Sequence, residues 1–337
     1  MLSGLIAQLP DPQRPRSGIV SLVMKTQQIG TSPLISSRLS YGCMRIVGTW
    51  DPAQVDSGRI ATAEKAVVTA FESGYTLFDH ADIYCSGACE SVFGGVLKKA
   101  SGMRDRVLIA TKCGIRGNGE PNPDSPHRFD FSAEHILRSC DQSLKRLGVD
   151  VIDIYQLHRP DLLMDPIEVS EAFAKLHSAG KVRTFGVSNF SPSFVSTLKA
   201  TCPFPIVVNQ VEIHLGRLDC FYDGTLDQCL ADQITPLAWS PLGGGLLGSG
   251  GKVDQRHPKR EGLENLLKVL DGVASGYGVS RTVIALAWLL KHPAKIIPIV
   301  GSANPNHIRD AAKADGVELD REDWYRILVA ARMEPLP

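Results

Sequence analysis

The sequence predicts an α/β fold, a single (β/α)8 barrel with parallel strands, over residues 19–337. Short runs rich in Val, Ile, Leu and Phe alternate along the chain with segments whose apolar residues follow a helical period. Uninterrupted apolar runs of this kind are typical of parallel strands that helices cover on both faces. Eight such runs alternating with helices favour a closed barrel over an open sheet. The length of 337 residues fits, since one barrel domain takes about 250 residues.

Each predicted strand is an apolar run, and nearly all of them end on a polar or small residue. The eight strands cover residues 35–42, 75–79, 107–112, 151–158, 182–188, 206–210, 234–240 and 296–301. The last seven end on Asp79, Lys112, His158, Ser188, Gln210, Ser240 and Gly301. In a (β/α)8 barrel all these ends meet at one face, where active sites are built. One polar residue at a strand end usually just starts a loop, but seven together indicate a site.

Local signals mark the ends of several predicted helices. The helix over residues 165–179 has Asp165 as its N-cap, Pro166 in its first position and Glu168 three residues after the cap, and Gly180 follows its end. These residue types are typical of helix starts and ends, and Asp165 with Glu168 predicts a capping box. Ser191 with Pro192, and Asn304 with Pro305, predict the starts of two later helices in the same way.

The first 18 residues differ from the rest and are predicted to form a flexible N-terminal extension. They contain Pro10, Pro12 and Pro15 and lack the basic start of a signal peptide. Elsewhere no run reaches the roughly 18 apolar residues that a membrane helix needs. We therefore expect a cytoplasmic protein that does not bind membranes.

The charge and the cysteines narrow the class of partner. Lys plus Arg and Asp plus Glu both number 36, so no overall charge favours nucleic acid or an acidic membrane. The eight cysteines are scattered, and the closest pair, Cys85 and Cys89, has no further ligands at the spacing of a metal site. We expect reduced structural thiols, no metal, and a small molecule as the partner of a monomer or small homo-oligomer.

Four residues at or near the predicted strand ends form a set suited to acid–base chemistry, and we call them the tetrad: Asp79, Tyr84, Lys112 and His158. A free tyrosine has a pKa of about 10, and an adjacent ammonium such as that of Lys112 lowers it. Asp79 is available as the carboxylate partner of Lys112. His158 can donate a hydrogen bond to an oxygen on which negative charge develops. The set suits protonation of a carbonyl oxygen while a hydride reaches the carbon.

Each member of the tetrad also has a purely structural interpretation. Tyr84 could fill a loop, Asp79 and Lys112 could form a satisfied ion pair, and His158 could cap its strand. The residues alone leave both interpretations open.

Residues 243–248 read Gly-Gly-Gly-Leu-Leu-Gly and fit the pattern G-x-G-x-x-G. This pattern is typical of the dinucleotide-binding turn in a doubly wound sheet. Here it falls late in the chain, no second βαβ half follows it, and no acidic residue ends a strand about 20 positions on. We therefore reject the doubly wound sheet as the fold.

Six segments, in order along the chain, resemble those of the aldo-keto reductase superfamily. They are residues 74–84 (GYTLFDHADIY), 111–114 (TKCG), 156–161 (QLHRPD), 186–190 (GVSNF), 209–212 (NQVE) and 238–242 (AWSPL). Within the family, residues 158–165 and 223–228 resemble the bacterial YdhF-like oxidoreductases. The resemblance implies that Tyr84 is the proton donor, that Lys112 and Asp79 tune it, and that His158 orients the carbonyl group of a small substrate.

The resemblance also implies a nicotinamide cofactor, NADPH with NADH as the alternative. Ser188, Asn189 and Gln210 would hold its carboxamide, and Trp239 would stack on the nicotinamide ring. Residues 240–245 would form a strap over the pyrophosphate. The full set of implied cofactor-binding residues is Gly42, Met44, Ser188, Asn189, Gln210, Trp239, Ser240, Pro241, Leu242, Gly243, Gly301, Ser302, His307 and Arg309.

The adenosine end departs from the family pattern. Residues 301–309 occupy the loop and helix start that in the family bind the 2′-phosphate, and an anion at a helix N-terminus is physically favourable. Many relatives have Arg or Gln where this chain has His307, and Arg309 lies two residues further on. Fewer residues therefore match the family pattern at the adenosine end than at the tetrad, and the expectation of NADP over NAD depends on these few.

Two other functions remain open at this point. A lysine at a barrel strand end can form a Schiff base, so Lys112 also permits an aldolase. A chain with the same cofactor site could instead be a catalytically silent regulatory subunit, like the potassium-channel β-subunits that resemble reductases. The loops of such barrels set the substrate, here residues 116–131, 215–225 and those after Arg332, and their sequence does not name it.

Overall fold

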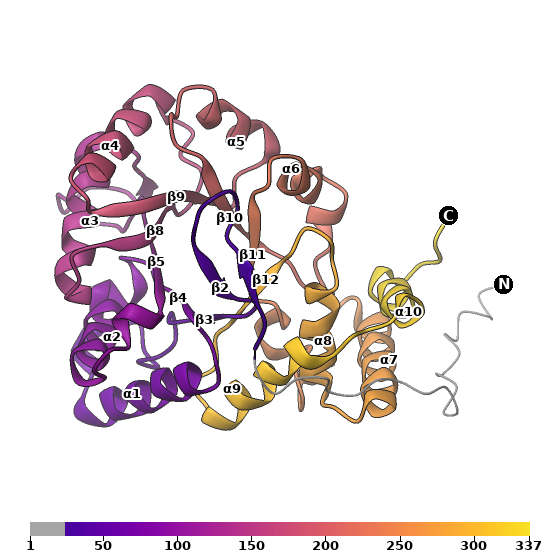
Figure 1. Ribbon diagram of the computed structural model, residues 1–337. Helices are drawn as coiled ribbons and strands as arrows, with labels where there is room; N and C mark the ends of the chain where they lie inside the picture. Colours follow the sequence, from indigo (N-terminus) through magenta and orange to yellow (C-terminus); the bar gives the residue numbers. More distant parts are fainter. Residues whose placement is uncertain (1–23) are drawn as a thin grey trace.

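In the computed structural model, which describes residues 24–337, eight parallel strands form a closed barrel that helices surround (Figure 1). In order around the barrel, the strands are β3 (Ser40–Gly42), β4 (Leu77–Asp79), β5 (Leu108–Cys113), β8 (Ile152–Leu157), β9 (Val182–Ser188), β10 (Ile206–Glu212), β11 (Thr235–Trp239) and β12 (Ile297–Val300). The predicted (β/α)8 barrel is confirmed. The predicted extension, residues 1–18, lies outside the described residues.

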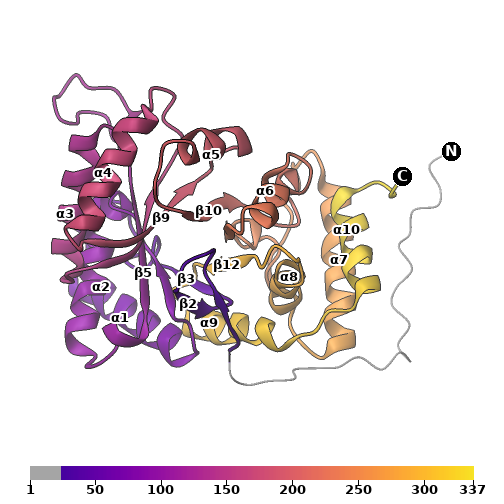
Figure 2. The same ribbon diagram turned by 45° about the horizontal axis from the view of Figure 1, so that its top comes forward.

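The helices follow the strands along the chain, and most of them cover the barrel. They are α1 (Ser57–Glu72), α2 (Ala88–Lys99), α3 (Ala133–Leu147), α4 (Pro166–Ser178), α5 (Pro192–Lys199), α6 (Thr225–Ala231), α7 (Arg260–Tyr277), α8 (Arg281–Leu290), α9 (Pro305–Ala312) and α10 (Arg321–Arg332). Figure 2 shows α7 and α10 packed side by side, outside the ring of barrel helices. A short hairpin of β6 (Ile115–Arg116) and β7 (Arg128–Phe129) lies in the loop after β5.

The first predicted strand, residues 35–42, is wrong as a single element. Its first half is β2 (Ile35–Ser37), which pairs antiparallel with β1 (Thr26–Gln28), and only its last residues form β3. The chain turns at Arg38, whose guanidinium donates to Asp315 Oδ1 at 3.1 Å and to the Leu290 carbonyl at 2.9 Å. Two residues of this hairpin, Ile29 and Leu34, are buried in the core inside the barrel, so the hairpin closes one end of it.

The predicted helix starts agree with the structure, apart from the capping box. The side chains of Asp165, Ser191 and Asn304 each accept a hydrogen bond from a backbone N–H in the first turn of α4, α5 and α9. Glu168 instead accepts from the backbone N–H of Ala133 at 2.8 Å, at the start of the neighbouring helix α3. The Glu168 carboxylate thus connects α4 to α3 and does not cap its own helix. It can do so because the first N–H groups of α3 have no acceptor within that helix.

Between residues 24 and 337, no single helix is long and apolar enough to cross a membrane. Only α7 and α8 taken together meet the length and composition of a span, and they are bent by 91° at the break between them.

Candidate active site

The tetrad forms one hydrogen-bonded group at the carboxyl ends of the strands. Asp79 ends β4, Lys112 lies in β5, His158 directly follows β8, and Tyr84 lies in the loop after β4. The Lys112 ammonium donates to Asp79 Oδ2 at 2.9 Å, to the phenol oxygen of Tyr84 at 3.1 Å and to the His80 carbonyl at 2.6 Å. All three of its N–H groups therefore have an acceptor.

Lys112 is charged in spite of its burial. Its side chain is fully buried and that of Asp79 is 4% exposed. Burial acts to lower the pKa of Lys112, but the charge of Asp79 and the hydrogen bonds to Asp79 and Tyr84 outweigh it, and the pKa is raised. Lys112 is therefore an ammonium at neutral pH, held by an ion pair with Asp79.

Tyr84 differs from the expectation of a lowered pKa. Burial raises the pKa of its phenol to about 12, although the charge of Lys112 acts to lower it. Asp79 adds to the rise, because its carboxylate offsets the ammonium that would stabilise the phenolate. Tyr84 is consequently a protonated phenol at neutral pH, the form that can donate a proton.

His158 faces the same space as a neutral imidazole. Its ring centroid lies 6.0 Å from that of Tyr84, edge to face. Burial, together with the positive charges of Lys112 and Arg159, holds its pKa well below the usual value. Its buried Nδ1 has no hydrogen-bond partner within residues 24–337. An uncharged imidazole in this position can orient a carbonyl oxygen by donating a hydrogen bond.

Gln210 supports the tetrad, a contact that the sequence did not indicate. Its Nε2 donates to Asp79 Oδ1 at 2.8 Å, so the two carboxylate oxygens of Asp79 are held by Gln210 and Lys112. The two residues lie 131 positions apart and meet because β10 and β4 face each other across the barrel.

Trp50 is a residue at the site that sequence reasoning missed. It lies in the loop after β3, its ring meets that of Tyr84 edge to face at 6.4 Å, and it is 60% exposed. An exposed tryptophan shortly after the first strand is the signal that could have identified it. It gives the site mouth an apolar wall next to the phenol.

A second buried ion pair lies behind Lys112. Glu90 is fully buried, accepts from the hydroxyl of Thr111 at 2.6 Å and pairs with Arg146 at 2.7 Å. Thr111 directly precedes Lys112 in β5, so this pair fixes the strand that carries the lysine. No sequence pattern predicted it.

The residues expected at the nicotinamide carboxamide lie together beside the tetrad. Asn189 Oδ1 accepts from the indole N–H of Trp239 at 3.0 Å, and its amide donates to the hydroxyl of Ser188 at 2.8 Å. Ser188 in turn donates to the Gln210 carbonyl at 2.9 Å. Asn189 has a φ of 61°, in the left-handed region that asparagine tolerates. These contacts join the side chains of Ser188, Asn189 and Trp239 into one unit on the backbone of Gln210, and the Asn189 amide also donates to the His158 carbonyl at 3.4 Å.

The strap residues are suited to a phosphate group. Ser240, Pro241, Leu242 and Gly243 follow β11 directly, and the glycines at 243, 244 and 245 have φ values of 56°, 68° and 105°. A Cβ atom at Gly244 or Gly245 would meet nothing within 4 Å, so the backbone there is open. The N–H groups of Gly243 and Gly245 donate to the carbonyls of Ser240 and Leu242 at 2.8 and 3.0 Å, so the strap is a tight turn whose open side leaves room for a phosphate group.

At the predicted adenosine end, the structure brings some residues together and leaves one apart. Gly301 and Ser302 follow β12, and the hydroxyl of Ser302 lies 3.4 Å from Nδ1 of His307. His307 and Arg309 are exposed, but Arg309 belongs to the last turn of α9. Gly42 ends β3, the strand next to β12, and a Cβ there would lie 2.8 Å from Ile299 and 3.7 Å from the Cα atom of Gly301. Met44, two residues further, packs partly buried against the core.

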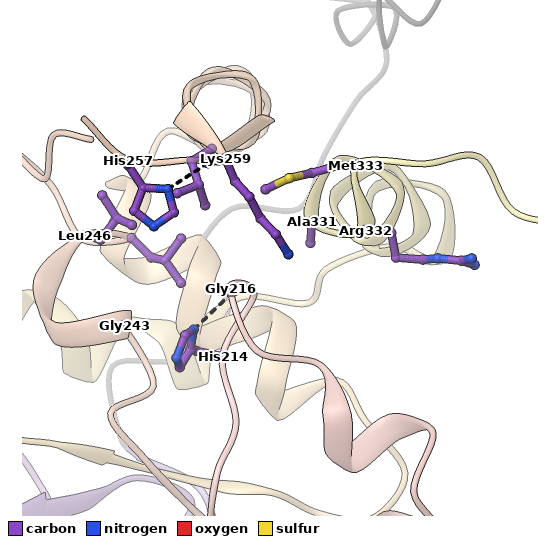
Figure 3. Close-up of a pocket in the computed structure, with 11 residues that line it drawn as sticks. His214, Gly216, Gly243, Leu246, His257, Lys259, Ala331, Arg332 and Met333 are labelled. Carbon is purple, nitrogen blue, oxygen red and sulfur yellow. Dashed lines mark hydrogen bonds between the residues drawn. The ribbon is translucent and has the colours of Figure 1, made fainter. Parts of the chain in front are cut away.

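A cavity of about 200 Å³ lies on the outer side of the strap, away from the tetrad. Its walls come from the loop after β10, the start of α7 and the end of α10, and Figure 3 shows the side chain of Lys259 extending into it. His214 links this loop to the strap, since a Cβ at Gly243 would lie 3.3 Å from its Nδ1. Of the predicted site residues, only Gly243 lines it.

The closed barrel and the strand-end tetrad define an oxidoreductase of the aldo-keto reductase class, and comparison with known proteins agrees. The model of the Aldo/keto reductase family matches residues 38–330, and the chain belongs to this family. It is 40% identical to the 6-dehydroglucose reductase of Novosphingobium aromaticivorans over 92% of this chain and 97% of that protein. It is also 40% identical to the oxidoreductase YdhF of Escherichia coli, over 77% of this chain and 83% of YdhF. The expected likeness to the YdhF-like group is thus confirmed.

A solved structure shows the same architecture. The thermostable aldo-keto reductase Tm1743, crystallised with the inhibitor epalrestat, superposes with a TM-score of 0.77 at 25% identity. The superposition covers 91% of this chain and all of that one.

Proposed function

We propose that this chain reduces a small aldehyde or ketone to an alcohol, using NADPH, with NADH as the alternative. The observation that carries the proposal is the phenol of Tyr84 hydrogen-bonded at 3.1 Å to the ammonium of Lys112, which Asp79 holds at 2.9 Å. Such a phenol is protonated at neutral pH, yet has a cation ready to stabilise its anion.

Each member of the tetrad has one task in this reaction. The bound nicotinamide supplies the hydride to the carbonyl carbon. Tyr84 donates its proton to the carbonyl oxygen, and Lys112 stabilises the phenolate that this leaves. Asp79 keeps Lys112 charged in its buried position, and the neutral imidazole of His158 orients the carbonyl oxygen.

The polar groups next to His158 and the open strap support the cofactor assignment. Ser188, Asn189 and Gln210 would hold the carboxamide, and Trp239 would face the nicotinamide ring. The strap and Gly301, where an added Cβ would meet nothing within 4 Å, leave room for phosphate groups. Ser302 and His307 would contact the 2′-phosphate, with Arg309 further out.

The named relative suggests a substrate class to test first. The protein from Novosphingobium aromaticivorans acts, by its name, on 6-dehydroglucose, which is an oxidised glucose. Small hydroxylated aldehydes therefore belong in the first substrate panel, beside simple aldehydes, ketones and quinones.

Two competing functions can be distinguished from the reductase by experiment, and the state of Lys112 already disfavours one of them, the aldolase. An aldolase needs a neutral, free amine, whereas the pKa of Lys112 is raised and its N–H groups are engaged. Borohydride trapping of a substrate on Lys112 would favour the aldolase. Tight NADPH binding without turnover on a broad carbonyl panel would favour the silent regulatory subunit.

The decisive experiment measures NADPH and NADH consumption across the panel, with Tyr84→Phe as the variant. We expect carbonyl-dependent oxidation of the cofactor by the wild type and a loss of at least about 100-fold in kcat for Tyr84→Phe, the usual contribution of a general acid. Retention of full activity by Tyr84→Phe would contradict the mechanism. We also propose that the protein is cytoplasmic and is a monomer or small homo-oligomer; light scattering can test the oligomeric state.

A further inference from the structure

Arg159 carries a positive charge that nothing in the described chain balances. It directly follows His158 in the loop after β8 and is partly buried. Within residues 24–337 its guanidinium has no hydrogen bond and no ion pair, whereas the buried Arg116 and the partly buried Arg104 and Arg146 each pair with a carboxylate. The contact that it does make is with an aromatic ring: its Cζ lies 5.3 Å from the centroid of Trp239.

This arrangement leaves hydrogen-bond donors open at the site mouth. A guanidinium is planar and has five N–H donors in a fixed fork. Its contact with an aromatic ring does not use these N–H groups, which can still donate hydrogen bonds. Donors that are partly removed from water and lack a partner favour oxygen acceptors, above all hydroxyl and carboxylate oxygens. The charge of Lys112, by contrast, is already balanced by Asp79 at 2.9 Å.

The position of Arg159 relates these donors to the reacting carbonyl group. His158, its neighbour in the chain, faces Tyr84, and Trp239 is tied through Asn189 to the residues beside the tetrad. A carbonyl oxygen held between Tyr84 and His158 would therefore place the rest of a small substrate next to the guanidinium. The exposed ring of Trp50 offers the carbon chain an apolar contact on the Tyr84 side.

We propose that Arg159 is a specificity-determining residue, which donates hydrogen bonds to oxygen substituents on the carbons near the carbonyl group. The preferred substrates are then small aldehydes rich in oxygen, with hydroxyl or carboxylate groups, rather than apolar aldehydes of the same length. The proposal depends on the proposed function, because it takes the carbonyl oxygen to lie between Tyr84 and His158.

The test compares three four-carbon aldehydes: butanal, D-erythrose and succinic semialdehyde. Arg159→Met removes the donors and keeps an apolar stem of similar length, and Arg159→Lys keeps the charge without the fork. We expect Arg159→Met to lower the ratio of kcat/KM for an oxygenated aldehyde to that for butanal by about 10- to 100-fold, the effect of one hydrogen bond to a charged group. The change should lie mainly in KM, and Arg159→Lys should restore part of the ratio.

Two controls separate this effect from others. Arg321→Met removes an arginine that lies at the same 5.3 Å from an aromatic ring, that of Tyr325 in α10, and should leave the ratio unchanged. Arg159→Met could also disturb cofactor binding, because Arg159 lies against Trp239. The dissociation constant of NADPH, measured by fluorescence for the variant and the wild type, reports any such effect.

Each outcome decides the proposal. A selective loss for D-erythrose identifies hydroxyl groups as the acceptors, and a selective loss for succinic semialdehyde identifies a carboxylate. A parallel loss for all three aldehydes, or an unchanged ratio, would overturn the role of Arg159 while leaving the proposed reduction intact. Absence of carbonyl-dependent NADPH oxidation by the wild type would instead reject the proposed function.

Discussion

Replacing Asp79 with asparagine removes the carboxylate that pairs with Lys112 and keeps the size of the side chain. Asp79 accepts from Lys112 at 2.9 Å and from Gln210 at 2.8 Å. An asparagine has one acceptor oxygen, so it can serve only one of these donors well, and it carries no charge. The substitution therefore leaves a buried ammonium without its counter-charge.

The expected loss of stability follows from the burial of the pair. Breaking a buried ion pair by removing one partner costs about 3–5 kcal/mol. The Lys112 side chain is 0% exposed and that of Asp79 4%, so water screens the pair little. Because the His80 carbonyl and the phenol of Tyr84 remain as acceptors, we expect the lower end, about 3 kcal/mol at pH 7.

The loss should depend on pH with a definite sign. In the wild type the folded-state pKa of Lys112 is raised, so its contribution is present below the unfolded pKa of about 10.4 and is lost as the pH rises through the folded value. In the variant, burial without Asp79 lowers the pKa of Lys112. The unfolded state then binds more protons than the folded state, and the stability of the variant rises with pH up to about 10.4. The difference between the two proteins is thus largest near neutral pH.

Urea unfolding, followed by tryptophan fluorescence between about pH 6 and pH 9.5, measures this difference. Asp141→Asn is the matched control, since Asp141 pairs with Lys181 at 2.6 Å with side chains 53% and 39% exposed. Such a surface pair contributes about 0–1 kcal/mol. A loss for Asp79→Asn no larger than that of the control, or one that does not change with pH, would refute the buried charged pair.

Two further predictions concern the rate of carbonyl reduction. The kcat/KM profile should stay flat from about pH 6 to pH 9, because the pKa of Tyr84 is about 12 and that of His158 is held well below its usual value; a step near pH 6.5 would contradict a neutral His158. Gln210→Met removes the donor to Asp79 and should lower kcat/KM by about tenfold, the value of one hydrogen bond to a charged group. Gln228→Met, which loses a donor to the Pro192 carbonyl in α5, should leave the rate unchanged.

Strand-end reasoning located most of the site because barrel closure fixes the level of each strand. Asp79 pairs in register with Ala110, two residues before Lys112, and Lys112 pairs with Gln156, two residues before His158, so the site residues of adjacent strands are staggered by two positions, as the tilt of barrel strands requires. A sequence shows where an apolar run ends, and the closed barrel then brings those ends to one face. Side-chain chemistry at that face was therefore predictable from local patterns alone.

Other features depend on tertiary packing that no local pattern encodes. The contact between Gln210 and Asp79 joins strands on opposite sides of the barrel. The pKa of Tyr84 is set first by burial, which is known only once the surrounding side chains are placed. The division of residues 35–42 into β2 and β3 follows from the turn at Arg38, whose partners Asp315 and Leu290 are more than 250 positions away.

Arg159 has a second effect, on the pKa of His158, which follows from the charges of the tetrad. Asp79 and Lys112 balance each other, and Tyr84 and His158 are both neutral, so the group as a whole has no net charge. Arg159 adds an unbalanced positive charge beside it and helps keep the imidazole of His158 neutral. The same guanidinium that would bind substrate oxygens therefore also adds to burial and to Lys112 in keeping His158 in the form that orients a carbonyl without competing with Tyr84 as the acid. Removal of Arg159 should raise the pKa of His158, which NMR titration of its imidazole can detect independently of any substrate.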